Sequence, residues 1–313
     1  MAAGSIPCGI SIPQVFVDGK VDMQFVRDYL AKAETLGYDS LWVQEKIIGA
    51  FAMLEPVSLL TYAAAVTSKL KLGTSVLLTV LRNPVQLAKS LSTLDQMSQG
   101  RLIVGVGIGA GLGRYVTIQE PVFGLSGARR VRRFEEGLQV MKALWTEAVA
   151  TVDGDFWKLK NVAMEPKPFQ KSHPPIWFGG HCEPALRRAV KYGDGWMGAG
   201  SSSTADFIKE SALLRRFLDE AKRDPATFPI SKRVYIAVDN DRDRAERRLR
   251  EWFAIRYGNA DLANRVALWG SRNECLNKLG ELVRAGVQHL SFNPAFDRMD
   301  HLELLATEIM LKL

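Results

Sequence analysis

Cysteine is scarce in this sequence: Cys8, Cys182 and Cys275 are the only three among 313 residues. An odd number of cysteines without close spacing fits neither a disulfide framework nor a four-ligand zinc site. The four histidines also lack the His-x-x-x-His spacing of a catalytic zinc site. We therefore expect no metal centre, and we expect the protein to work in a reducing compartment, the cytoplasm.

Long hydrophobic runs are missing as well. No stretch reaches the ~18 apolar residues that a membrane-spanning helix needs, and residues 1–7 lack the basic and apolar segments of a secretory signal. The sequence also contains no G-x-S-x-G and no G-x-x-x-x-G-K-[ST] motif. These absences predict a soluble protein that is neither a serine hydrolase nor a P-loop nucleotide hydrolase.

The charge balance is moderately basic, with 41 lysines and arginines against 34 acidic residues and a net charge of +7. Such a surface can attract nucleic acid, anionic lipid or a phosphorylated small molecule. The densest charged segment, residues 239–250, mixes both signs and is predicted to be the solvated face of a helix, so we expect no nucleic-acid partner. The hydrophobic content of 47% is sufficient for a large core and excludes a disordered chain.

Short apolar runs alternate with segments of helical periodicity along the chain. The runs predicted as strands lie at residues 8–13, 40–43, 71–78, 102–107, 175–178, 195–197, 232–238 and 288–292. Helices are predicted over residues 26–36, 57–67, 84–100 and 129–145, and near Pro184, Thr204, Asp241 and Asp300. The fourth run is nearly all apolar, as expected of a parallel strand that is buried on both faces.

This alternation predicts the fold class. Eight strand–helix repeats without a composition shift or a flexible linker favour a closed α/β barrel, the (β/α)8 TIM barrel, over an open doubly wound sheet. We expect a single domain over residues 1–313. Within it, the Asp153-Gly154 pair predicts a hairpin, and a proline-rich segment follows at residues 165–168. We interpret residues 146–174 as an insertion.

Glycines crowd the end of the fourth predicted strand, at residues 105–113. Their spacing does not match the G-x-G-x-x-G fingerprint of dinucleotide binding, because alanine, leucine and arginine stand where the last glycine would be needed. We predict instead that Gly107 and Gly109 let a ligand approach the backbone closely. A flexible turn is the alternative.

The loops after the fifth and sixth predicted strands are suited to an anion. Gly179, Gly180 and His181 precede a helix with a proline in its first turn, and the free N–H groups of a helix start favour a phosphate. Gly200 and Ser201 follow the next strand and offer further donors. Because phosphate sites of such barrels cluster in the late loops, we predict a phosphorylated cofactor here. Plain turns are the alternative.

An acid and a base, Glu45 and Lys46, come just after the second predicted strand. In a barrel this is the catalytic face, so the pair is a candidate for catalysis. A surface ion pair is the alternative interpretation.

Several longer stretches point together to a family. They are LGYDSLWV at residues 36–43, LGTSVL at 72–77 with RNP at 82–84, TLDQMSQGRL at 93–102, EPKP at 165–168 and GDGW at 193–196. In this order the sequence resembles the luciferase-like monooxygenase family, the bacterial luciferase superfamily of flavin- and deazaflavin-dependent oxidoreductases. The resemblance covers essentially the whole chain.

The resemblance implies a (β/α)8 barrel with the cofactor ring at the carboxyl ends of the strands. The compact length is similar to that of the branch that uses the deazaflavin coenzyme F420, which implies hydride transfer between F420 and a small organic substrate. The alternative in this fold is an FMNH2-dependent monooxygenase that uses O2 and needs a separate flavin or F420 reductase. A non-catalytic flavin- or nucleic-acid-binding protein is the alternative of another class. A homodimer stays open.

Individual residues follow from the same resemblance. Deazaflavin-dependent relatives carry an acid–histidine pair at the positions of Glu45 and Lys46, and many place a glutamate where this sequence has Ala110. The proton-handling groups therefore differ from those of the sugar-phosphate and alcohol dehydrogenases of the family. The resemblance also implies a non-prolyl cis peptide at Ser75-Val76 that contacts the cofactor ring, whereas local composition alone predicts a regular strand.

Overall fold

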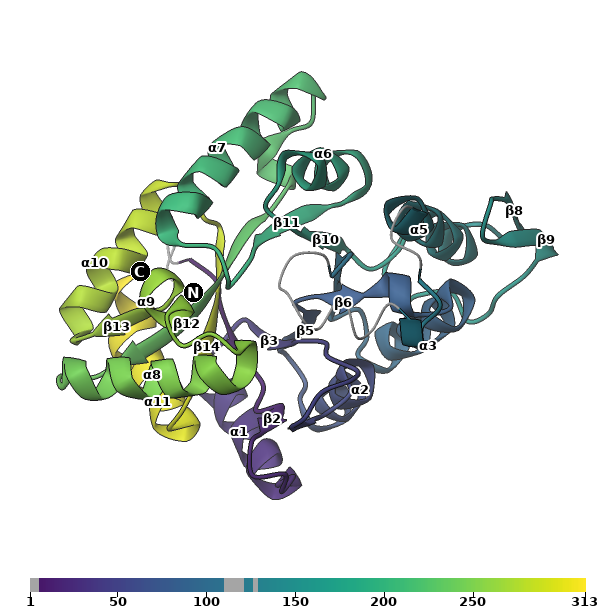
Figure 1. Ribbon diagram of the computed structural model, residues 1–313. Coiled ribbons are helices and arrows are strands. Elements are labelled where there is room, and N and C mark those ends of the chain that lie inside the picture. The colour runs from purple at the N-terminus through teal and green to yellow at the C-terminus, as the bar shows by residue number, and fades with distance from the viewer. Residues whose placement is uncertain (1–5, 110–120, 126–128) are drawn as a thin grey trace.

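Parallel strands close into a barrel in the computed structural model, which describes residues 6–109, 121–125 and 129–313 (Figure 1). The eight strands of the barrel are, in spatial order, β1 (Cys8–Ser11), β3 (Ser40–Val43), β5 (Lys71–Thr74), β7 (Leu102–Gly107), β10 (Ile176–Gly179), β11 (Gly195–Gly198), β12 (Ile230–Val238) and β14 (His289–Pro294). Strand β14 pairs with β1 and β7 pairs with β10, so no edge is left open. The predicted (β/α)8 barrel is confirmed.

Helices surround the barrel on its outer side (Figure 1). They are α1 (Met23–Thr35), α2 (Pro56–Val66), α3 (Pro84–Met97), α5 (Arg130–Thr146), α6 (Glu183–Tyr192), α7 (Thr204–Glu220), α8 (Arg242–Tyr257), α9 (Leu262–Val266), α10 (Arg272–Arg284) and α11 (Arg298–Leu304). Side-chain caps fix several starts: the Asn83 carboxamide oxygen accepts from the N–H groups of Val85 and Gln86 in the first turn of α3, and Ser203 forms a capping box with Asp206. None of the helices described is long and apolar enough to cross a membrane.

The third predicted strand, residues 71–78, is interrupted. Strand β5 ends at Thr74, and a two-residue strand, β6 (Leu77–Leu78), follows and pairs with β7. The Ser75–Val76 peptide bond between them is cis, as the family resemblance implies. The regular strand expected from local composition is therefore wrong at this point.

The segment between β12 and β14 is richer than predicted. Beyond α8 and α9 it contains α10 and a short strand, β13 (Leu268–Gly270), which pairs with β12 in parallel. Sequence reasoning missed α10 although a capping box between Ser271 and Glu274 marks its start. Residues Cys275, Leu279 and Leu282 give it a narrow buried face.

A hairpin of β8 (Ala150–Asp153) and β9 (Lys158–Val162) extends from the barrel beside α5 (Figure 1). The buried carboxylate of Glu136 on α5 accepts hydrogen bonds from the N–H groups of Asp155, Phe156 and Trp157 in its turn. A Cβ on Gly154 would lie 2.0 Å from the same carboxylate, so this turn requires glycine. A smaller ribbon pairs β2 (Val15–Phe16) with β4 (Ala52–Met53).

Aromatic and polar side chains fill the amino-terminal half of the barrel. The Trp42 and Trp177 rings stack with their centroids 5.5 Å apart, and His289 contacts both. The two His289 ring nitrogens lie 2.9 Å from Ser40 Oγ and 2.7 Å from Ser231 Oγ, so this buried imidazole is satisfied. This packing separates a cavity at the amino-terminal ends of the strands, lined by Trp177 and His289, from the space at their carboxyl ends.

Candidate active site

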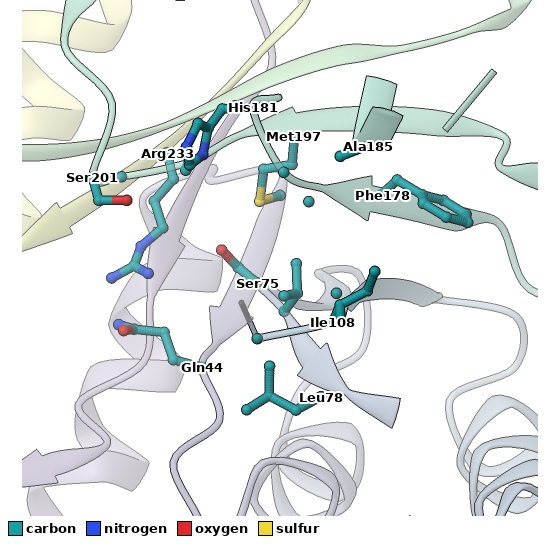
Figure 2. Close-up of a pocket in the computed structure, with 18 of the residues that line it drawn as sticks. Gln44, Ser75, Leu78, Ile108, Phe178, His181, Ala185, Met197, Ser201 and Arg233 are labelled. Atoms are coloured by element: carbon teal, nitrogen blue, oxygen red, sulfur yellow. The ribbon is translucent and has the colours of Figure 1, made fainter. Parts of the chain in front are cut away.

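A cavity of about 340 Å³ lies at the carboxyl ends of the barrel strands. Figure 2 shows side chains from opposite sides of the barrel that enclose it. All nine residues that the sequence predicts to bind a cofactor line this cavity: Ser75, Val76, Gly107, Gly109, Gly179, Gly180, His181, Gly200 and Ser201. Glu45 lines it as well, whereas Lys46 is not among its lining residues. The sequence therefore locates the cavity but says little about its other walls.

Val76 occupies the space beside two of the predicted glycines. A Cβ on Gly107 would lie 2.6 Å from Val76 Cγ2, and a Cβ on Gly179 would lie 2.9 Å from Val76 Cγ1. Both separations are well below the ~3.5–4.0 Å of normal carbon contacts. Val76 therefore requires glycine at these two positions. Its methyl groups contact the paired strands β7 and β10, and its side chain lies at the cavity wall.

The loop from β10 to α6 is shaped by Gly180. Its φ of +123° is strained for any other residue, and a Cβ there would lie 2.8 Å from Ala185 Cβ. The carbonyl oxygen of Gly180 accepts from Trp196 Nε1 at 2.8 Å, which fixes the loop. Cys182, the N-cap of α6, makes no side-chain cap, and both Cys182 and Ala185 line the cavity. The positive end of this ten-residue helix therefore faces the cavity.

Lys232 stabilises the loop from β11 to α7 through hydrogen bonds. Its ammonium group donates to the carbonyl oxygens of Ala199 and Ser202, the latter at 2.8 Å, and lies 3.2 Å from Ser202 Oγ. Burial lowers the pKa of Lys232 to about 7. The carboxylate of Glu210 accepts from the same hydroxyl at 3.4 Å, and burial raises the pKa of Glu210 to about 7. This buried pair fixes the loop that carries Gly200 and Ser201.

Glu45 is engaged by a guanidinium and a backbone N–H. Its carboxylate accepts from Arg82 Nε at 2.9 Å, from Arg82 Nη2 and from the N–H of Leu78, and Arg82 also pairs with Glu55 at 2.7 Å. Burial raises the pKa of Glu45, and the positive charge of Arg82 opposes this rise. The network ties the end of β3 to β6 and to the start of α2.

Lys46 contacts an aromatic ring. Its Nζ stands 4.0 Å from the centroid of the Phe51 ring, a cation–π contact, and the side chain is half-buried. The structure thus brings Glu45 to the cavity wall but does not bring Lys46 there.

Sequence reasoning missed the most polar wall of the cavity. Gln44, Arg233, Arg256 and Tyr257 all line it, and none was predicted. A signal existed for Arg233: two cations, Lys232 and Arg233, begin a strand that is otherwise apolar and buried along its whole length. A charge inside a strand covered on both faces is costly unless it has a function or a partner.

The match to known proteins covers nearly the whole barrel. The family model described as luciferase-like monooxygenase matches residues 8–289. The chain belongs to this family. The match confirms the resemblance found in the sequence, and since this is a family of monooxygenases, this luciferase-like protein is an oxidoreductase.

Three relatives of this luciferase-like protein share 28% sequence identity with it or less. A phthiodiolone/phenolphthiodiolone dimycocerosates ketoreductase of Mycobacterium sp. (strain JLS) is 28% identical over 244 residues, which cover 74% of this chain and 62% of that relative. The structure of an F420-dependent secondary alcohol dehydrogenase with an F420-acetone adduct has a TM-score of 0.82 at 21% identity, covering 97% of this chain and 98% of the other. The FMN complex of the oxygenating constituent of 3,6-diketocamphane monooxygenase from Pseudomonas putida has a TM-score of 0.77 at 18% identity, covering 99% of both chains. At these identities the two structures establish the fold.

Those two solved proteins hold an F420-acetone adduct and FMN, respectively. The roles predicted for Glu45 and Lys46 in catalysis, and for the nine residues in cofactor binding, stay predictions. Ala110, which stands where many relatives have a glutamate, lies outside the described residues.

Proposed function

We propose that this luciferase-like oxidoreductase transfers hydride between coenzyme F420 and a small organic substrate in the cavity at the carboxyl ends of the strands. The observation that carries the proposal is the convergence of all nine predicted cofactor-binding residues on one cavity, although they come from strands far apart in the sequence. The fold shared with an F420-dependent alcohol dehydrogenase supports it.

In this proposal the cofactor lies across the cavity, with its ring at one end and its phosphate at the other. Val76, on the cis peptide, would contact the ring, while Gly179, Gly180 and His181 would hold the phosphate at the start of α6. Ser201 would donate from the neighbouring loop. The positive φ of Gly180 and the uncapped start of α6 leave backbone room and positive charge where a phosphate needs both.

When bound, the deazaflavin supplies or accepts the hydride, and the protein supplies position and environment. Leu78, Ile108 and Phe178 form an apolar wall that excludes water from the reacting atoms (Figure 2). Glu45 holds the N–H of Leu78 and so fixes the segment that follows Val76. Its role in this proposal is positioning.

A second candidate is the FMNH2-dependent monooxygenase. The observation that favours it is the state of the acid–base pair: Glu45 is neutralised by Arg82, and Lys46 replaces the histidine and points to Phe51. The acid–histidine pair of the deazaflavin-dependent relatives is thus incomplete here, and a monooxygenase would require a separate reductase.

The proposal is tested by titrating the purified protein with F420, FMN and FAD side by side. We expect F420 to bind most tightly and turnover to proceed without O2. Tighter binding of FMN together with O2-dependent turnover would establish the monooxygenase, and no binding of any of the three would refute both candidates.

A charge in the phosphate site makes the test local. Ser201→Asp should weaken F420 binding by at least ~10-fold, equivalent to about 1.4 kcal/mol, because a carboxylate repels the phosphate. Ser201→Asn, of the same size and without charge, is the matched control. Equal affinities of the two variants would show that the phosphate lies elsewhere.

A further inference from the structure

Two buried arginines line the cavity without an acidic partner. Arg233, on β12, is 6% exposed, and Arg256, on α8, is 8% exposed. Within the part of the chain that the structure describes, no carboxylate oxygen lies within 4.0 Å of either guanidinium. A buried cation without a counter-ion is destabilising, so its presence in a cavity wall needs a reason.

Among the described residues, each of the two guanidinium groups donates a single hydrogen bond. Arg233 Nη2 donates to Tyr235 Oη at 2.6 Å, and Arg256 Nη2 donates to Gln44 Oε1 at 3.1 Å. The Nε atoms of both arginines are buried and have no partner among the described residues. A guanidinium carries five N–H donors in a planar fork that matches the oxygens of a carboxylate or a phosphate.

Aromatic rings hold both arginines in place. Arg233 Cζ lies 4.8 Å from the centroid of the Tyr235 ring, and Arg256 Cζ lies 5.4 Å from that of Tyr257. The two tyrosine hydroxyls share a hydrogen bond of 2.6 Å, so they form one support. The donors are therefore fixed before any ligand arrives, which lowers the entropy cost of binding.

Arg256 lies toward a different part of the cavity from the phosphate loop after β10, whereas Figure 2 draws Arg233 beside His181 of that loop. Arg256 contacts Gln44 at the end of β3, and in the barrel β5 and β7 separate β3 from β10 on the shorter side. Figure 2 shows Arg233 on the side of the cavity opposite to Phe178, with its guanidinium directed toward Gln44. Arg233 also borders Gly200, so its neighbourhood reaches the second phosphate loop.

We propose that Arg233 and Arg256 bind an oxyanion, a carboxylate or a phosphate, that belongs to the organic substrate. The substrate class is then an anion with an apolar body, since Ile108 and Phe178 form the opposite wall. This inference rests on the proposed function, because the same cavity must hold the cofactor and the substrate together.

The test uses benzoate as the probe and benzamide as its uncharged counterpart. In cofactor-free protein, millimolar benzoate should raise the Tm by about 2 °C or more, and benzamide should not. Arg233→Gln and Arg256→Gln should each weaken benzoate binding at least ~10-fold, or about 1.4 kcal/mol. Arg250→Gln, on the same helix but paired with Asp261 and more exposed, is the control and should keep the effect. Arg233→Lys keeps the charge and should recover part of it.

Other outcomes separate the possible sources of the anion. If F420 or FMN binds at least ~10-fold more weakly to the glutamine variants while riboflavin, which has no phosphate, is unaffected, the arginines serve the cofactor and the inference is overturned. It is also overturned if the variants keep the benzoate effect. If no cofactor binds the wild type but the benzoate effect still depends on both arginines, the proposed function fails and the oxyanion site stands.

Discussion

Replacing Arg82 by methionine should destabilise the barrel strongly. The Glu45 side chain is fully buried and Arg82 is only 22% exposed, so the substitution leaves a buried carboxylate without its cation. Breaking such a pair from one side costs about 3 to 5 kcal/mol of unfolding free energy. We expect this loss at pH 8 in urea unfolding, as a lower midpoint with an unchanged slope.

The loss should depend on pH in a definite direction. Burial already raises the pKa of Glu45, and removal of Arg82 raises it further. A carboxyl whose folded pKa exceeds its unfolded value of 4.5 contributes stability that is present below pH 4.5 and is lost as the pH rises through the folded pKa. Arg82→Met should therefore cost less at pH 5 than at pH 8.

The double variant provides the control. Glu45→Gln removes the charge but leaves Arg82 its partner Glu55, so it should cost only about 1 to 2 kcal/mol. Glu45→Gln combined with Arg82→Met should be more stable than Arg82→Met alone, because no buried charge remains. A cost of Arg82→Met below about 1 kcal/mol, or a double variant less stable than Arg82→Met, would refute the account of the pair.

Three further outcomes are expected. Burial lowers the pKa of His289 to about 4. The neutral ring therefore contributes stability that is present above pH 6.5 and is lost as the pH falls through about 4. In His289→Gln, the unfolding free energy should fall less steeply with decreasing pH over this range. Gly107→Ala should cost about 1 to 3 kcal/mol in urea unfolding by overpacking against Val76, and Val76→Ala should restore part of the loss; equal costs in both backgrounds would contradict the contact. Arg233→Met should leave the Tm unchanged or raise it, because a buried cation is removed; a clear fall in Tm would mean that its bond to Tyr235 matters more.

Local patterns were sufficient to predict the barrel. Strands such as β7 are short apolar runs that alternate with segments of helical periodicity, and this alternation can be recognised in a single sequence. The interruption at Ser75–Val76 does not follow from local composition, since Leu72–Leu78 is ordinary strand sequence, and only the family resemblance predicted it. Helix α10 was not predicted because only three of its residues are buried, and Gly280 weakens its helical pattern.

The cavity was predictable where backbone chemistry forms it and not where side chains reach it from far away. Glycines at the ends of β7 and β10 are visible in the sequence. Arg256, in contrast, comes from a helix whose other arginines are exposed or half-buried; its position three residues after Phe253 and four after Trp252 puts it on the apolar face, but that spacing does not indicate a cavity. Its contact with Gln44 joins residues 212 positions apart, a separation that no local pattern encodes.

The position of Val76 between two glycines has a consequence for how this enzyme can be remodelled. Glycine has no smaller replacement, so the paired strands β7 and β10, whose Gly107 and Gly179 contact the Val76 methyl groups, cannot yield space to a larger side chain. Any volume added at residue 76 must therefore be taken from the cavity, and any volume removed is returned to it. In the proposed function this wall faces the cofactor ring, so Val76→Ala should enlarge and Val76→Ile should reduce the space beside the ring, without redesign of the surrounding barrel.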